Sequence, residues 1–139
     1  MLTIPKLRRR EYQEHLNKFI ERIISRADVV GILIFGSVAR GLEKPFPESD
    51  IDVLVIARDI PQNLYERRIK NLKYKEGAET VEDIWLTPKE LLDGIDGGWG
   101  VLLDAIADGI IVYDKEGILR TARKIVYKKF KRVGRIWIL

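Results

Sequence analysis

The chain has 139 residues, of which 46% are apolar and 33% are charged, with no cysteine and a single histidine. This composition excludes a disordered tail, a disulfide-stabilised fold and cysteine-based catalysis or zinc binding. Lysine and arginine number 25 against 21 aspartates and glutamates, which favours an anionic partner. No apolar run is long enough to cross a bilayer and no signal-peptide pattern is present, so we expect a cytoplasmic protein without membrane contact.

The first half of the chain predicts two helices and three strands. Apolar residues recur at three- and four-residue spacing over residues 7–26, which predicts an amphipathic helix. The continuous apolar run of residues 29–35 predicts a buried strand, and a second strand follows at 50–57. Residues 64–74 then predict a helix, and 80–86 predict a third strand.

The second half predicts three helices and one more strand. Thr87-Pro88-Lys89-Glu90 has the pattern of a capping box, which begins a helix. Glycines separate this helix from another at 101–107, a short strand follows at 110–113, and a basic helix is expected at 118–133.

The order of these elements predicts the fold class. We expect one domain over residues 1–139, with a core at about 29–113 flanked by the helices at 7–26 and 118–133. The class is α/β (α+β): a small mixed β-sheet backed by helices on one face.

Two aspartates at the start of the second predicted strand are the first candidate site residues. Asp50 and Asp52 are two positions apart, so both side chains leave the same face of the sheet, while Ile51 and Val53 point into the core. Neighbouring carboxylates repel each other unless they share a cation, and Mg²⁺ or Mn²⁺ suits an all-oxygen site. The alternative is that one aspartate caps the strand and the other is a solvated edge residue.

A glycine and a serine end the first predicted strand. Gly36 lets a ligand approach the backbone closely, and the Ser37 hydroxyl with nearby amides can hold phosphate oxygens. Ser37 lacks the G-x-S-x-G elbow of hydrolases, and the one histidine lies in the first helix, so a serine nucleophile is not expected. Walker and G-x-G-x-x-G motifs are also absent.

A third acid is expected on the third predicted strand. If Ile84 and Leu86 face the core, alternation puts Asp83 on the open face with the aspartate pair. Glu82 would then begin the buried row and be the weaker candidate. We therefore predict Asp83 as the third carboxylate.

The motifs GSVARG and SDIDVLV, followed by an acid in a later strand, resemble the polymerase-β-type nucleotidyltransferase superfamily, specifically its minimal nucleotidyltransferases. The resemblance covers residues 29–112. It implies transfer of a nucleoside monophosphate from an NTP to an acceptor hydroxyl, and we expect AMP to be transferred from ATP. Asp50, Asp52 and Asp83 would be the catalytic, metal-binding residues for Mg²⁺ or Mn²⁺.

The same resemblance implies a nucleotide site at the turn after the first strand. Gly36 and Ser37 would hold the triphosphate. Arg40 follows this turn and could also reach the phosphates; the alternative is an exposed arginine or one paired with Glu43.

The resemblance also suggests a partner. Minimal nucleotidyltransferases resemble the antitoxin half of toxin–antitoxin systems, whose helical HEPN-type partner receives AMP. Two alternatives remain open: a catalytically idle binding module that neutralises such a partner, and a nucleic-acid-binding protein that uses the basic segment 118–133 on RNA. The acid set favours catalysis, because a scaffold gains nothing from clustered carboxylates. The apolar end 136–139 either folds back or contacts the partner or a second copy of the chain.

Overall fold

A four-stranded mixed sheet organises the computed structural model, which describes residues 1–139. The strand order is β3-β2-β1-β4; β1 runs antiparallel to both of its neighbours, and β2 runs parallel to β3. The strand bounds are β1 Val29–Phe35, β2 Ile51–Ala57, β3 Val81–Leu86 and β4 Ile110–Asp114. The predicted strands and the mixed sheet are confirmed, with each strand end within one residue of its expected place.

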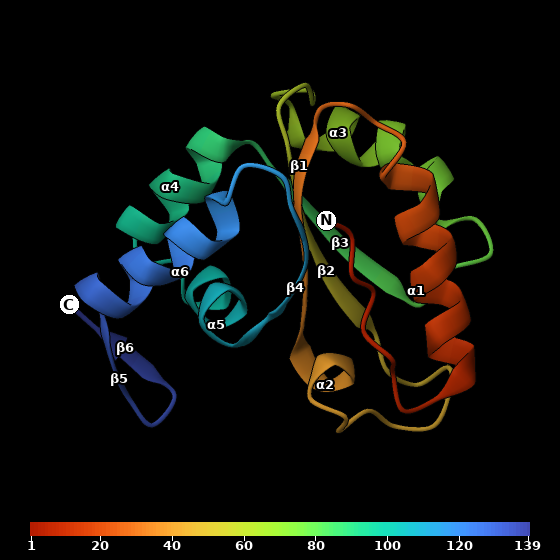
Figure 1. Ribbon diagram of the computed structural model, residues 1–139, viewed down its shortest axis with the longest axis horizontal. Helices are drawn as coiled ribbons and strands as arrows, with labels where there is room; N and C mark the ends of the chain where they lie inside the picture. The colour runs from red at the N-terminus through yellow and green to blue at the C-terminus, as the bar shows by residue number, and fades with distance from the viewer.

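Helices cover both faces of the sheet, so the expectation that they back only one face is wrong (Figure 1). On one face lie α1 Arg10–Ile23, α3 Leu64–Asn71 and the 3₁₀ turn η1 Leu72–Lys75. On the other lie α4 Pro88–Asp96, α5 Gly100–Asp108 and α6 Ile118–Lys129. Apart from Asp52, the central strands β1 and β2 are apolar along their whole length rather than at alternate positions, because both of their faces are buried.

Each face of the sheet has its own apolar core. Val53 and Val55 of β2 join the cluster under α1, whereas Leu54 and Ile56 join the cluster under α4, α5 and α6. The stripe predicted for the first helix packs in the first of these clusters. Ile24 is partly buried there, and the other members of the stripe are fully buried: Tyr12, Leu16, Phe19, Ile20 and Ile23. Burying side chains of this size contributes about 1.5–3 kcal/mol each, which fixes α1 on the sheet.

The capping box predicted at Thr87 is present at the start of α4. The Thr87 side chain accepts a hydrogen bond from the Glu90 amide at 3.1 Å, and the Glu90 carboxylate accepts one from the Thr87 amide at 2.8 Å. Pro88 occupies the first helical position. None of the helices has the length and apolarity that a membrane span requires.

The C-terminal residues form a hairpin, which corrects the predicted helix over 118–133. Helix α6 ends at Lys129, and β5 Lys131–Val133 pairs antiparallel with β6 Ile136–Ile138. The turn between them begins at Gly134, whose φ of 60° is favourable for glycine and suits a two-residue hairpin turn. Trp137 of β6 connects the hairpin to α5, because its indole donates a hydrogen bond to Asp104 at 2.9 Å.

Candidate active site

The turn that follows β1 brings the backbone against Asp52. It forms the short helix α2 Gly36–Ala39, which lies at the end of β1 and beside β2 (Figure 1). Gly36 has a φ of +78°, and a Cβ added there would clash with the carboxylate of Asp52. Both the backbone conformation and the space therefore require glycine at this position. The predicted closeness of the GSVARG turn to the aspartates is present in the structure.

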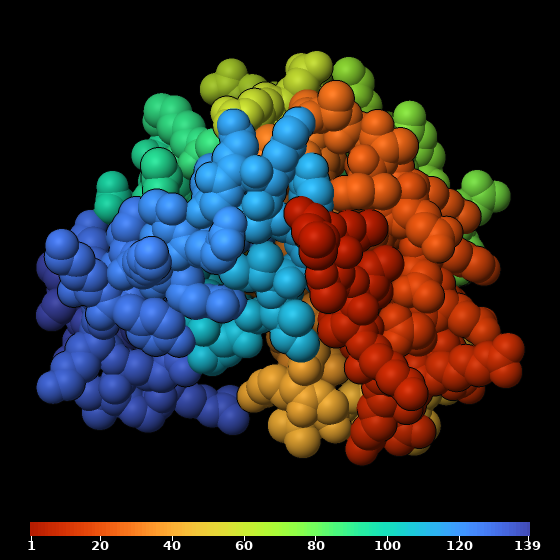
Figure 2. Space-filling model, in the orientation of Figure 1, coloured from red at the N-terminus to blue at the C-terminus, as the bar shows by residue number.

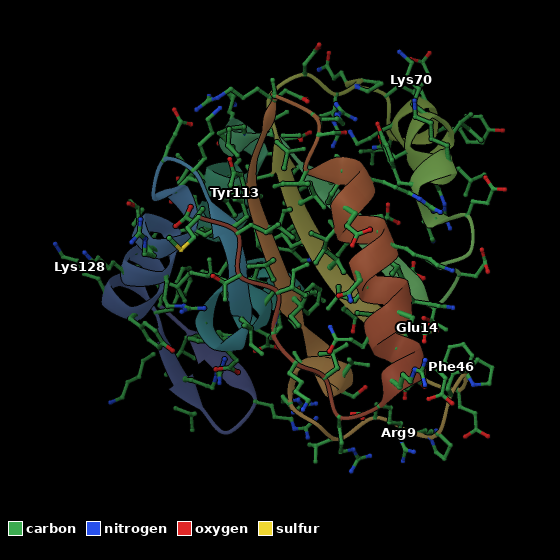
Figure 3. All side chains as sticks on the ribbon, turned by 45° about the vertical axis from the view of Figure 1, so that its right-hand side comes forward. Arg9, Glu14, Phe46, Lys70, Tyr113 and Lys128 are labelled. Carbon is green, nitrogen blue, oxygen red and sulfur yellow. The ribbon has the colours of Figure 1, made fainter.

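The loop that leads into Asp50 is fixed to α1. The ring of Phe46 packs edge-on against the rings of Tyr12 and His15, at centroid distances of 5.3 and 5.0 Å. Figure 3 shows Phe46 beside the first turns of α1. The Tyr12 hydroxyl accepts a hydrogen bond from the amide of Ser49 at 2.9 Å. Because Ser49 immediately precedes Asp50, this contact holds the start of the acidic motif in place.

The two aspartates of SDIDVLV lie on one face of the sheet, as predicted. Ile51 and Val53, which alternate with them, are fully buried in the core under α1. Asp52 therefore points to the opposite face and is half-buried, and Asp50 is exposed at the strand's start. The aspartates lie on the same face as Leu54 but at the end of β2 where the chain enters the strand.

The third carboxylate on this face is Glu82, which corrects the expectation of Asp83. Strands β2 and β3 pair in parallel with Asp52 opposite Glu82 and Val53 opposite Asp83. Asp83 thus leaves the other face, where it accepts a hydrogen bond from the Trp85 indole at 2.7 Å and lies 3.6 Å from the Lys75 ammonium. Its contacts are those of a structural residue. Glu82 is exposed and free of ion pairs.

The charges of Asp50 and Glu82 act on Asp52. Burial first, and then the negative charges of Asp50 and Glu82, together raise the pKa of Asp52 from 3.8 to about 6. Repulsion of this kind is relieved by a bound cation. No three acidic or histidine side chains form a closed metal cage. Mg²⁺ needs only one or two carboxylates, because water and substrate phosphates complete its shell.

A cavity of about 320 Å³ opens beside Asp52. Gly36 and Arg40 line it together with Asp52, so the structure brings these predicted residues together; Ser37 follows Gly36 in the same turn but does not line the cavity. Arg40 is exposed and forms no ion pair. The alternative pairing with Glu43 is absent, because Glu43 is paired with Arg8 at 3.0 Å and with Arg9 at 3.8 Å.

The far wall of this cavity comes from parts of the chain that sequence reasoning did not assign to the site. Asp104 and Asp108 of α5 contribute to it, and so do Arg132, Gly134 and Arg135 of the hairpin. The glycine of the turn was the one local signal for the hairpin. Nothing in the sequence relates these residues to the GSVARG turn, because the relationship depends on how α5 and the hairpin fold over the sheet.

Comparison with known proteins shows the family. The sequence pattern of the nucleotidyltransferase domain matches residues 16–95, more than half of the chain. A protein of Methanocaldococcus jannaschii named "Putative protein adenylyltransferase" is 26% identical over 140 aligned positions, which cover 91% of this chain and 90% of that protein.

Solved structures show the same fold. A toxin–antitoxin crystal structure with AMP-PNP matches with a TM-score of 0.53, 16% identity and 86% coverage of both chains. A complex of a tri-AMPylated Shewanella oneidensis HEPN toxin with an MNT antitoxin matches with a TM-score of 0.50, 17% identity and 84% coverage of both chains. As the GSVARG and SDIDVLV motifs indicated, this chain belongs to the nucleotidyltransferase domain family and is a nucleotidyltransferase with that family's mixed α/β fold.

Proposed function

We propose that this protein is a Mg²⁺-dependent adenylyltransferase that moves AMP from ATP to a hydroxyl group of a partner protein. The observation that carries the proposal is the position of Asp52, which lies directly against the glycine turn, beside its register partner Glu82 and within the electrostatic reach of Asp50. A carboxylate that lines the cavity, with the charges of two further acids acting on it, suits a cation that arrives with a nucleotide.

The donor set fits a divalent cation. Asp50 and Asp52 would hold Mg²⁺ or Mn²⁺, with Glu82 on the same face of the sheet. A bound cation would offset the burial and the neighbouring charges that raise the pKa of Asp52. The chemistry that a bound cation supplies is neutralisation of phosphate charge and activation of the attacking oxygen.

The chain's own residues would bind and orient the substrates. Gly36 lets the turn approach the carboxylates, and Arg40 would offset negative charge on the triphosphate. In the transfer, the acceptor oxygen forms a bond to the α-phosphorus, and the bond from that phosphorus to the pyrophosphate oxygen breaks. Glu82, the exposed acid of the three, is suited to accept the proton of the attacking hydroxyl.

The proposed acceptor is a helical HEPN-type protein, which makes this chain the antitoxin of a toxin–antitoxin pair. Two relatives support this choice: the Methanocaldococcus jannaschii protein is named a protein adenylyltransferase, and the Shewanella oneidensis complex contains an AMPylated HEPN toxin. The alternative acceptor is RNA, and the alternative assembly is a homo-oligomer of this chain.

The test uses ATP labelled at the α-phosphate, Mg²⁺ and the HEPN-type protein encoded beside this chain. We expect label on the partner protein, no label from ATP labelled at the γ-phosphate, and no transfer by Asp52→Asn. Complex formation without any label would instead identify an idle binding module. Label on RNA would identify a different acceptor.

A further inference from the structure

We propose that the C-terminal hairpin is part of the nucleotide site, and that Arg135 in its turn binds the phosphates of the NTP from the side opposite Arg40. This inference rests on the proposed function, because it concerns the substrate of the same site. It assigns a binding role to a segment that lies outside the matched family region of residues 16–95.

The hairpin lies across the cavity from the glycine turn at Gly36. Gly36, Arg40 and Asp52 form one wall, and Arg132, Gly134 and Arg135 belong to the other. Figure 2 shows the C-terminal residues, in dark blue, reaching toward α2 at the lower edge of the molecule. A ligand in this cavity that contacts Asp52 therefore also meets the turn of the hairpin.

The hairpin is held in this position by its inner face. Arg132 forms ion pairs with Asp108 at 2.9 Å and with Asp104 at 3.2 Å, and its guanidinium lies 4.2 Å from the ring centroid of Trp137. Trp137 in turn donates a hydrogen bond to Asp104 and packs against the core under α5. These contacts to α5 are made by side chains, and they orient the turn toward the cavity.

The charges along the cavity are divided between paired and unpaired groups. Arg132 is balanced by Asp104 and Asp108, whereas Arg40 and Arg135 form no ion pair with any residue of the chain. Two free guanidinium groups opposite a carboxylate site suit a polyanion that carries its own divalent cation. A nucleoside triphosphate bound to Mg²⁺ is such a ligand, and guanidinium groups bind its phosphate oxygens through two parallel hydrogen bonds.

The size of the cavity agrees with this assignment. At about 320 Å³ it lies at the lower end of the range for small-molecule sites, roughly 300–1,000 Å³. It therefore suits the phosphate chain, with the rest of the nucleotide extending outward. The number of phosphates should accordingly determine how much Arg135 contributes to binding.

The test is the affinity for Mg²⁺–ATP and for AMP, measured by calorimetry on the full chain. We expect Arg135→Ala and Arg40→Ala each to weaken Mg²⁺–ATP binding by about tenfold, the value of one charge-assisted hydrogen-bonded contact. AMP binding should change by less than about twofold, because AMP lacks the β- and γ-phosphates. Arg135→Lys should recover part of the loss.

Lys128→Ala is the matched control, since it removes one positive charge from an exposed side chain of α6 that does not line the cavity. Figure 3 shows Lys128 at the outer side of the molecule. It should bind Mg²⁺–ATP as the wild type does. Arg135 has no ion pair to lose, so the melting temperature of Arg135→Ala should stay at the wild-type value.

Two results separate this inference from the proposed function. Wild-type affinity in Arg135→Ala, together with lost affinity in Asp52→Asn, would overturn the hairpin's role and leave the proposed site intact. Arg135-dependent Mg²⁺–ATP binding without any adenylyl transfer would support the hairpin's role and count against the transferase proposal. Failure of the wild type to bind Mg²⁺–ATP would overturn both.

Discussion

Asp52 and Glu82 are register partners on the neighbouring parallel strands β2 and β3, and their carboxylates leave the sheet on the same face. The next residue, Asp83, leaves the opposite face and contacts Trp85 and Lys75. Glu82, the acid proposed to act in the reaction, and Asp83, which makes structural contacts, are therefore one residue apart on β3 and lie on opposite faces of the sheet.

The first prediction separates these two acids. Glu82→Gln should lower adenylyl transfer by about a hundredfold or more, because it removes a charge that acts on the reacting groups. Asp83→Asn should retain most of the transfer and lose about 1 kcal/mol of folding stability, since it weakens the contacts to Trp85 and Lys75. A transfer assay measures the rate for each variant, and chemical denaturation measures its folding stability. The reverse ranking of the two rates would show that Asp83 is the third ligand.

The second prediction concerns the glycine turn. Gly36→Ala should abolish Mg²⁺–ATP binding, because the new Cβ would push against the Asp52 carboxylate. Gly41→Ala is the matched control: its φ of +69° gives similar backbone strain, about 1–2 kcal/mol, but no atom lies within 4 Å of the added Cβ. Both variants should lose similar stability, and only Gly36→Ala should lose the nucleotide. Equal nucleotide affinities in the two variants would contradict this account.

The third prediction follows from the pKa of Asp52, which is raised to about 6. Because the folded protein holds this proton more tightly than the unfolded chain, stability without metal should fall as pH rises from about 4 to about 6 and stay low above that. Asp52→Asn removes the penalty. Allowing for solvent screening, the variant should be more stable than wild type by about 1 kcal/mol at pH 8 and no more stable at pH 3.5.

Thermal unfolding of metal-free protein at both pH values tests this difference. Added Mg²⁺ should reduce the advantage of Asp52→Asn at pH 8, because only the wild type gains the cation. An Asp52→Asn variant that is less stable than wild type at pH 8 would mean that the carboxylate supports the fold.

The fourth prediction concerns the outer face of the hairpin, where Val133, Ile136 and Ile138 are exposed at 56%, 67% and 46%. Because these apolar side chains remain exposed on the folded hairpin, we expect this face to contact the partner protein. Ile136→Asp should therefore weaken binding of the HEPN-type partner by about tenfold while leaving Mg²⁺–ATP binding unchanged. Deleting residues 130–139 should weaken both, because it also removes Arg135. Calorimetry measures the affinity of both variants for the partner. Wild-type partner affinity in both variants would contradict this prediction.

The sequence predicted the sheet because the signals for its strands are local. Residues 29–35 form an unbroken apolar run that a buried strand requires, and Thr87 to Glu90 carry their own capping contacts. The aspartate pair was predictable for the same reason, since alternation along a single strand fixes its common face.

The third acid was not predictable from alternation. In β3, both rows of side chains carry apolar residues: Trp85 shares a face with Asp83, and Ile84 shares one with Glu82. When helices cover both faces of a sheet, apolar side chains no longer indicate which face carries the site. The pairing of β3 with β2 decides it, and that pairing is a long-range contact.

The hairpin was missed because Phe130 and Val133 continue the helical spacing of α6. Gly134 signalled a turn, but the contacts that stabilise the hairpin come from Asp104 and Asp108 of α5. The hairpin depends on ion pairs with another element, so its own residues carry little information about its conformation.

The most direct test of the account is a transfer assay with ATP labelled at the α-phosphate, Mg²⁺ and the HEPN-type partner, run with wild type, Glu82→Gln and Asp83→Asn. We expect label on the partner with wild type and Asp83→Asn, and label at a rate at least about a hundredfold lower with Glu82→Gln. Absence of label with every form of the protein, under conditions in which the complex assembles, would contradict the account.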